Sequence, residues 1–345
     1  MPPEVLTQRH LNRALLARQM LLERGRTSIP KTLERVCGIQ AQYAPSMYVG
    51  LWSRLEDFER EQLDRALERR SVAQGTLMRI TIHLVSARDW WPFATALREA
   101  RRQWVLKARR QDPAEVARAA DRLRELMGGE PMPTARIREL LGVPLGWNAA
   151  LWLDMVRVPP SGTWARRRAD LYALAEDWLR NDPGEQDVAA ATDHLVRACL
   201  RGFGPMRPAD IVSLTGLRTP DVHESLARLD LRRFRDEQDK ELVDVPRAPL
   251  PDPDTPAPPR LLATWDPTLL LPNIRRAGTF LDRHRPRLTN SAYPQGMSLF
   301  TVDGVAAGAW KFEKGQVTLD PFEKLDRASL RQLREEAERL AQLHR

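Results

Sequence analysis

RPADIVSLTG (residues 207–216) and TPDVHESLARLD (residues 219–230) follow each other with the spacing of a helix-turn-helix, and Thr219-Pro220 begins the second helix. Residues 231–245, LRRFRDEQDKELVDV, read as a short hairpin with a charged turn. A further helix is expected over residues 188–203. Three helices followed by a two-stranded wing predict a winged-helix unit, which is a DNA-binding structure.

The chain before this segment repeats the same pattern twice. In the first copy Thr7 can cap the opening helix, and Ser28 precedes Pro30 at the start of the next. The first copy has expected helices over 11–24, 30–40 and 58–70, expected strands over 72–78 and 79–85, and a long basic helix after Asp89. The second copy has expected helices over 114–127, 134–142 and 148–156, then two strand-like pieces around the PPSG turn at 159–162.

The last third of the chain changes character. Residues 246–260 hold seven prolines, which predicts a stiff, extended connector. Beyond it, strand-and-turn pieces and a closing amphipathic helix suggest a small β-rich domain. The fold class is therefore α+β, mainly α with β wings. The predicted units are 1–110, 111–185 and 186–245 as winged helices, 246–260 as linker, and 261–345 as the β-rich domain.

Composition favours a soluble DNA-binding protein. The 345 residues carry a formal charge of +8, and 48 of the 54 basic residues are arginine. The arginine guanidinium forms paired hydrogen bonds to phosphate, so an acidic polymer is a natural partner. The alternative explanation is a GC-rich genome, which would also enrich arginine. The sequence holds no apolar run long enough for a membrane span and no signal peptide. Its two cysteines lie far apart, which suits a reducing cytoplasm. We expect a cytoplasmic, nucleoid-associated protein.

No familiar catalytic or metal motif is present in the sequence. There is no P-loop, no dinucleotide fingerprint, no CxxC or HExxH, and the six histidines are scattered, so we expect neither a metal nor an organic cofactor. Taken by themselves, the residues predict a basic winged-helix DNA-binding protein. The default protein of that kind is a transcription regulator.

One group of motifs is more specific. GIQAQYAP (38–45), GLWSRL (50–55) and LMRITIHLVSARDW (77–90) resemble the AlkZ/YcaQ family of winged-helix DNA glycosylases. GPMRPADIVSLTGL, WDPTLLLPNIRR and VDGVAAGAWKF resemble later blocks of the same family. The resemblance implies tandem winged helices with a C-terminal barrel-like piece. It also implies excision of alkylated purines from double-stranded DNA, including crosslinked ones, without metal or cofactor.

The family's paired catalytic glutamines correspond to Gln40 and Gln42 here. This Gln-Ala-Gln version lacks the carboxylate of the Gln-apolar-Asp version, which places the chain nearer the specialised, toxin-resistance branch. A glutamine amide cannot deprotonate water, but it can hold a water beside the developing sugar cation while a cationic alkylpurine leaves. Without the resemblance, the two glutamines would read as the hydrogen-bonded end of the second helix.

Further DNA contacts are expected from basic and aromatic residues near the wings. Arg79 and His83 flank the return strand of the first wing, although His83 could equally be a satisfied, half-buried histidine. The others are Trp164, Arg166, Arg167 and Arg168 after the PPSGT turn, and Arg276. A solvated, charged strand end is the alternative for the arginine run.

Two functions remain open at this point: a monofunctional DNA glycosylase and a non-enzymatic winged-helix regulator. Regulators usually dimerise on palindromic sites, and only the short C-terminal helix could serve that purpose, so we expect a monomer. If the protein acts on crosslinks, the base must stay near the duplex. Gln40 and Gln42 should then be solvent-accessible on a basic concave face, with no deep nucleobase-sized pocket beside them.

Overall fold

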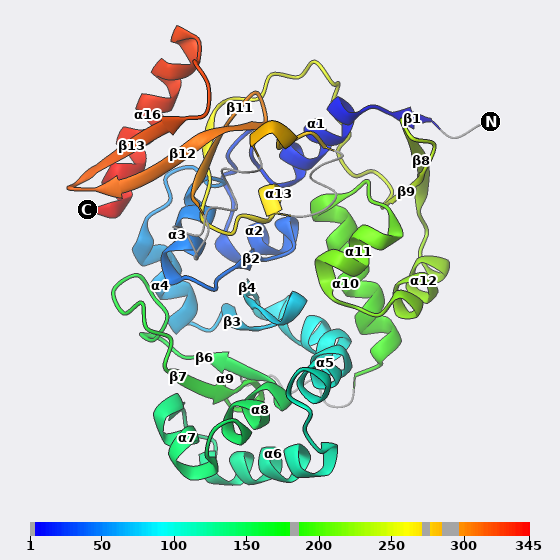
Figure 1. Cartoon of the computed structure of the whole chain (residues 1–345), viewed down its shortest axis with the longest axis vertical. Coiled ribbons are helices and arrows are strands. Elements are labelled where there is room, and N and C mark those ends of the chain that lie inside the picture. The colour runs from blue at the N-terminus through cyan, green and yellow to red at the C-terminus, as the bar shows by residue number, and fades with distance from the viewer. Residues whose placement is uncertain (1–3, 180–185, 271–276, 285–296) are drawn as a thin grey trace.

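The computed structural model describes residues 4–179, 186–270, 277–284 and 297–345, which form the helices and three sheets drawn in Figure 1. The six-stranded sheet has the order β2-β4-β3-β6-β7-β5, and every neighbouring pair is antiparallel. It joins the hairpins of the first two predicted units into one sheet. The structure is therefore α+β, and the first two wings are not separate structures.

The first region begins with a capped helix, because the Thr7 side chain accepts a hydrogen bond from the backbone N–H of His10. Strand β3 occurs where the alternation of β-branched residues predicted it, whereas the strand expected over 79–85 begins only at Ile82, because residues 78–80 form the turn η1. The elements are α1 (Gln8–Arg18), α2 (Ile29–Val36), β2 (Ile39–Gln40), α3 (Ala44–Trp52), α4 (Arg60–Glu68), β3 (Val72–Thr76), η1 (Met78–Ile80), β4 (Ile82–Ser86) and α5 (Ala87–Arg109).

The second region adds helices to one end of the same sheet (Figure 1). Asp112 caps its first helix and Gly128 ends it in a left-handed conformation. The elements are α6 (Pro113–Met127), β5 (Met132–Pro133), α7 (Thr134–Leu141), α8 (Leu145–Trp152), β6 (Met155–Arg157), β7 (Leu171–Leu174) and α9 (Ala175–Leu179).

The third region confirms the helix-turn-helix and hairpin that were expected from the sequence. Gly216, at φ 81°, ends the first helix of the pair. The N-terminal strand β1 (Val5–Leu6) adds to the hairpin in parallel, giving the sheet β1-β8-β9. The elements are α10 (Val188–Phe203), α11 (Pro208–Thr215), α12 (Thr219–Arg228), β8 (Arg232–Asp236) and β9 (Glu241–Asp244).

The C-terminal region is an open four-stranded sheet, β10-β11-β12-β13, and not a closed barrel in the part of the chain that the structure describes. The barrel-like expectation is therefore wrong: β10 and β13 are edges, and α16 packs beside them. The elements are β10 (Arg260–Leu261), α13 (Pro267–Leu270), η2 (Asp282–His284), β11 (Leu299–Val302), β12 (Val305–Glu313), β13 (Gln316–Pro321) and α16 (Arg327–His344).

Two predicted helices end earlier in the structure than expected, and one helix was not predicted. The helix expected to reach Gln40 ends at Val36, because Cys37 and Gly38 both adopt left-handed backbone conformations, at φ 63° and 76°. Helix α3 was missed because all of its residues are buried, so the sequence shows no polar face and no amphipathic period. The helix expected over 148–156 ends at Trp152, and the next residues form β6.

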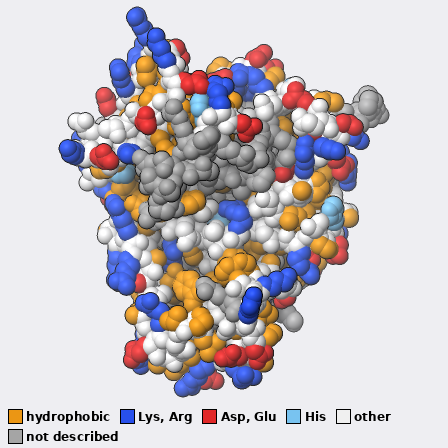
Figure 2. All heavy atoms as spheres, viewed as in Figure 1, with side chains coloured by type: hydrophobic (Ala, Val, Ile, Leu, Met, Phe, Trp, Pro, Cys, Tyr) orange, Lys and Arg blue, Asp and Glu red, His pale blue; other side chains and the backbone are white. Residues whose placement is uncertain are grey.

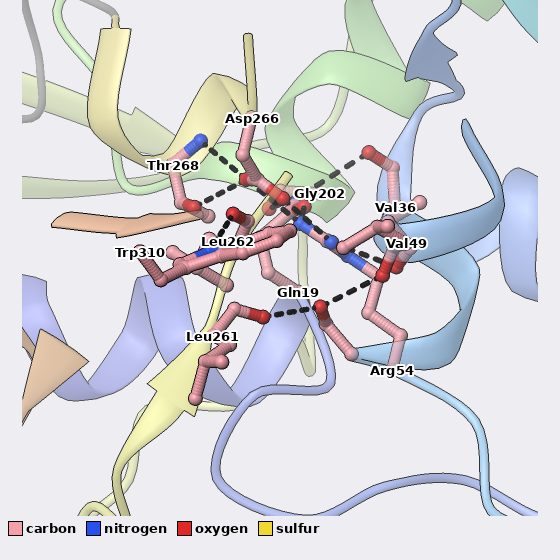
Figure 3. Close-up of polar contacts among 12 residues, drawn as sticks. Gln19, Val36, Val49, Arg54, Gly202, Leu261, Leu262, Asp266, Thr268 and Trp310 are labelled. Atoms are coloured by element: carbon pink, nitrogen blue, oxygen red, sulfur yellow. Dashed lines mark hydrogen bonds and ion pairs between the residues drawn. The ribbon is translucent and has the colours of Figure 1, made fainter. Parts of the chain in front are cut away.

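Buried polar contacts join regions that are far apart in the chain. Arg54, at the end of α3, forms a doubly hydrogen-bonded ion pair with Asp266, at 2.8 and 3.0 Å (Figure 3). Gln19 accepts from Arg54 and donates to the backbone carbonyls of Val36 and Gly202, in α2 and α10. The proline-rich segment lies against α1, since the Arg18 guanidinium donates to the carbonyl of Pro249. Among the described residues, no helix combines the length and apolarity needed to cross a bilayer.

Candidate active site at the paired glutamines

The Gln-Ala-Gln segment is held at one edge of the six-stranded sheet. After the left-handed pair Cys37-Gly38, the chain turns into β2, where Gln40 lies opposite His83 of β4. The backbone N–H of Ala41 continues this pairing by donating to the carbonyl of Ile82, at 2.7 Å. The motif therefore lies on an edge strand and in the turn that follows it.

Gln40 points inward and is 8% exposed. Its Oε1 accepts a hydrogen bond from Nη2 of Arg79, at 3.0 Å. A guanidinium can only donate, so the carbonyl end of the Gln40 amide must face Arg79. The expectation of solvent access is therefore wrong for Gln40.

Gln42 lies on the surface, as expected. Its Oε1 accepts from the backbone N–H of Ile82, at 3.1 Å. Because a backbone N–H only donates, the oxygen is identified by its partner, and the Gln42 amide is held in one orientation. The oxygen keeps a second lone pair, and the NH₂ group keeps its donors, for a water or a substrate.

Two arginines hold the segment from either side. Besides Gln40, Arg79 donates to the carbonyl of Leu214, at 2.6 Å, at the end of α11. Arg157 of β6 donates to the carbonyl of Ala41 and to the hydroxyl of Tyr172, both at 3.0 Å. Neither arginine forms an ion pair with a carboxylate in the described ranges, so the motif lies between two uncompensated cations. Burial lowers the pKa of Arg79 from its ordinary value.

The sequence analysis did not single out Arg157. A lone arginine within the apolar run MVRVPP was the available signal, since a cation on a buried strand needs partners of its own.

A pocket of about 330 Å³ opens beside Gln42. It lies between strands of the six-stranded sheet and the helices α5, α7 and α8. Gln42, Arg157 and Tyr172 line it, together with two tryptophans, Trp104 and Trp147. A pocket therefore lies beside Gln42, and it opens to the surface past the exposed rings of Trp104 and Trp147.

His83 does not reach the surface. The ring is 3% exposed, and its Nδ1 lies 3.0 Å from the carbonyl of Thr81. Burial, together with the nearby charge of Arg79, lowers the pKa of His83 to about 3. The histidine is neutral in the folded protein and supplies no positive charge for a phosphate.

The other predicted DNA contacts are divided between surface and interior. Trp164 is half-buried: its ring meets those of Tyr48 and His344 edge-on, at centroid distances of 5.5 and 4.9 Å. The three arginines that follow Trp164 are exposed. Arg166 and Arg168 both pair with Asp170, and Arg167 donates to the hydroxyl of Tyr43, at 3.2 Å. Arg276 lies outside the described residues.

Within the described ranges, no group of three or more histidine, cysteine, aspartate or glutamate side chains could hold a metal ion. The groups around the motif are fixed amides, two cations and an aromatic pocket. Amides and guanidinium groups bind phosphate and sugar oxygens. A site of this composition, joined through Arg79 to the end of α11, is suited to the backbone of a nucleic acid.

The particular family follows from comparison. The family model described as DNA glycosylase AlkZ-like matches residues 33–343, so the chain belongs to this family. Membership makes the protein a DNA glycosylase, a DNA-repair hydrolase whose partner is DNA, and it favours the enzyme over the transcription regulator.

A solved structure shares the fold. The chain superposes on the DNA glycosylase AlkZ of Streptomyces sahachiroi with a TM-score of 0.77 and 17% identity, covering 98% of this chain and 97% of that one. A search of curated protein sequences finds no match.

Proposed function

We propose that the protein hydrolyses the N-glycosidic bond of purines alkylated at N3 or N7 in double-stranded DNA, crosslinked purines included. Such purines are cationic, so the C1′–N9 bond is already weakened. The observation that carries the proposal is the exposed Gln42 amide, oriented by the backbone of Ile82 at the edge of a pocket.

In this reaction the oxygen of a water bonds to C1′ while the C1′–N9 bond breaks. The bonding electron pair stays with the purine, which leaves as a neutral base. Gln42 Oε1 accepts one hydrogen of the water through its second lone pair, which places the water oxygen beside the sugar cation. Since an amide is no base near neutral pH, the proton passes to solvent.

Gln40 contributes from behind the surface. Arg79 binds the carbonyl oxygen of the Gln40 amide, so the NH₂ group of this amide can point toward the reacting nucleotide. We propose that Gln40 completes the site by donating to the sugar or to a phosphate. The uncompensated Arg157 cation adds a positive potential that attracts the DNA backbone, whereas Arg79 positions Gln40.

We propose a monofunctional glycosylase that acts as a monomer and needs no cofactor. A glycosylase that also cleaves the strand uses an amine to form a Schiff base. No lysine is among the described residues that line the pocket beside Gln42. We further propose that the three helix-and-hairpin segments act as winged helices on the DNA, with phosphate contacts from Arg167 and its neighbours.

The test uses a duplex that carries one N7-methylguanine, followed by alkaline cleavage of the abasic product. We expect release of the base by the parent protein and its loss, by a factor of about 100 or more, in Gln42→Ala and Gln40→Ala. Duplex affinity should stay within a few-fold. Gln42→Glu should retain more activity than Gln42→Ala, because a carboxylate can still orient water.

Gln316→Ala is the matched control, since Gln316 is exposed on the C-terminal sheet and far along the chain from the motif. Parental activity in both motif variants would remove the proposed site. Strand breaks before alkali treatment would contradict the monofunctional assignment.

A further inference from the structure

A second pocket, of about 410 Å³, begins at Tyr43, the residue that follows Gln42 in the chain. The N-terminal half of α3 forms one of its walls, and strand β12 of the C-terminal sheet forms another. Arg167, from the segment between β6 and β7, and His344 of α16 also line it. Gln42 is not among the described lining residues, so this Tyr43 pocket is distinct from the pocket beside Gln42.

Two polar atoms in the wall of the Tyr43 pocket lack hydrogen-bond partners. Ser46 is 3% exposed, and no group in the described part of the chain bonds its Oγ. The same holds for Nε2 of His344. Burial and the nearby charge of Arg167 lower the pKa of His344 to about 4, so the ring is neutral. Because buried polar groups are nearly always paired in native proteins, two in one pocket point to a polar ligand.

Aromatic rings and cations supply much of the remaining lining. Tyr43 is 38% exposed, and the ring of Phe312 stacks on that of His344 at a centroid distance of 4.1 Å. Arg167 donates to the Tyr43 hydroxyl at 3.2 Å, and both Arg167 and Lys311 are exposed. Figure 2 shows lysine and arginine side chains along the left of the molecule, where the segment between β6 and β7 runs in Figure 1. Rings bind a base by stacking and cations bind phosphate, so this lining suits a nucleotide.

The volume and position of the Tyr43 pocket restrict which nucleotide it could hold. An apolar cavity of about 150 Å³ holds one benzene ring, and this pocket has more than twice that volume. A base and part of its sugar therefore fit. The alkylated purine is not the occupant, because the amide that orients the water, that of Gln42, does not line this pocket.

We propose that the Tyr43 pocket receives an undamaged nucleotide adjacent to the alkylated purine, with its base against Tyr43 and Phe312 and its phosphate at Arg167. The inference rests on the proposed function, which places the alkylated purine at Gln42, one residue from the pocket. Stacking on aromatic side chains replaces part of the stacking that the base loses on leaving the duplex. The alkylated purine then remains near the duplex while its sugar is uncovered for the water, as a crosslinked base requires.

The experiment uses 5-iodouracil, which forms photocrosslinks to aromatic side chains that it contacts. It is placed in turn at the nucleotides immediately 5′ and 3′ of an N7-methylguanine whose sugar carries a 2′-fluorine, which slows base loss during irradiation. Mass spectrometry identifies the crosslinked residues. We expect crosslinks to Tyr43 or Phe312 from one of these positions, and none from a distant position in the same duplex.

Two variants test the pocket without removing either ring. Thr264→Trp fills the pocket, since Thr264 is half-buried in its wall, and should reduce the crosslink yield by about fivefold or more, the lower end for loss of one stacking contact. Ser46→Ala should reduce the yield by about threefold, as for loss of one hydrogen bond. Because this hydroxyl has no partner in the described chain, its removal should not lower the stability of the free protein.

Thr318→Trp is the matched control, because it makes the same substitution on the same sheet at an exposed residue of β13 that does not line the pocket. It should leave the crosslink yield unchanged. Circular dichroism confirms that each variant is folded.

Absence of crosslinks to both rings from both flanking positions, or a parental yield in Thr264→Trp, overturns the proposal. Binding of free deoxynucleoside monophosphates, measured by NMR, without any crosslink from DNA also overturns it, because the pocket would then serve a soluble ligand. Base release from N7-methylguanine without the fluorine is measured in parallel. Crosslinks without base release would refute the proposed function and leave the nucleotide site in place, whereas base release without crosslinks would refute only this inference.

Discussion

Arg79 connects the Gln-Ala-Gln segment to the helix-turn-helix of the third region. Its guanidinium bonds both Gln40 and the carbonyl of Leu214, and its backbone adopts a left-handed conformation, at φ 52°, as does that of Ile80, at φ 57°. Two consecutive non-glycine residues in this region of φ cost energy, so the surrounding contacts must hold them there. We infer that Arg79 positions Gln40 and is not primarily a phosphate contact.

Replacement of Arg79 by alanine should therefore affect catalysis more than binding. We expect kcat for base release to fall by roughly tenfold or more, as for loss of a hydrogen bond from a charged group, with duplex affinity nearly unchanged. Arg331→Ala is the exposed control, since Arg331 pairs with Glu335 on the surface of α16. A variant with parental kcat, weaker binding and a salt dependence of binding reduced by about one ion would show that Arg79 contacts a phosphate instead.

His83 predicts a specific dependence of stability on pH. Its pKa is lowered to about 3 in the folded protein by burial and by Arg79, whereas an unfolded histidine titrates near 6.5. Between these values the unfolded chain binds the proton and the folded one does not. The free energy of unfolding should thus fall as pH decreases below about 6.5, by up to about 1.4 kcal/mol per pH unit.

The measurement is urea unfolding between pH 7.5 and 5. His83→Asn should reduce the slope of the unfolding free energy against pH, whatever its effect on stability at pH 7.5. His344, whose pKa burial lowers to about 4, retains its own contribution. Equal slopes in His83→Asn and the parent would show that His83 takes up a proton without unfolding.

At the scale of elements, the junction between α2 and β2 determines where the glutamines lie. Gly38 has φ 76°, and a Cβ at this position would lie 2.9 Å from Cγ1 of Val85 and 3.1 Å from the carbonyl oxygen of Leu84. The left-handed conformation and the close approach to β4 both require glycine here. Gln40 follows two residues later.

Gly38→Ala should lower the unfolding free energy by about 1–3 kcal/mol and reduce base release in the folded fraction, because the β2–β4 pairing would shift. Gly315→Ala is a matched control. Gly315 has φ 81°, but no described atom lies within 4 Å of the place its Cβ would take, so only the backbone cost of about 1 kcal/mol applies. Denaturant midpoints and single-turnover rates give both quantities. Equal effects of the two variants on base release would show that the junction does not position Gln40.

At the scale of the molecule, a buried polar network holds the regions together. Asp266 and Arg54 are almost fully buried, and Gln19 extends the network to α2 and α10 (Figure 3). Burial acts to raise the pKa of Asp266, but Arg54 and Thr268 outweigh it and hold the pKa below its ordinary value. The carboxylate is therefore ionised, and the network joins the N-terminal, third and C-terminal regions.

Removal of one partner leaves the other charge buried and unpaired. Asp266→Ala should lower the unfolding free energy by about 3–5 kcal/mol. In the parent protein, the N-terminal, third and C-terminal regions should unfold in one transition. Glu56→Ala, which breaks the exposed pair with Arg26, should change the unfolding free energy far less. Calorimetry distinguishes one transition from several. A stable Asp266→Ala protein, or separate transitions for the regions, would contradict this role of the network.

The sequence by itself determined the features that depend on local chemistry. Capping and breaking residues together with apolar periodicity located α10, α11 and α12, and β-branched alternation located β3 and β4. The motif residues Gln40 and Gln42, with the blocks that follow them, indicated the glycosylase family that the comparison confirms. These features require only neighbouring residues, so a reading along the chain finds them.

Only the tertiary structure decided which side chains reach the surface and which residues meet. Gln40 and Gln42 are two residues apart, yet one is buried against Arg79 and the other is exposed, because Gln40 lies in β2 and Gln42 in the bend that follows it. Arg157 meets Ala41 from 116 positions away along the chain. The pocket beside Gln42 exists because α5 and α8 pack near the joined sheet. Contacts of this kind depend on how distant elements fold together, and no local pattern records them.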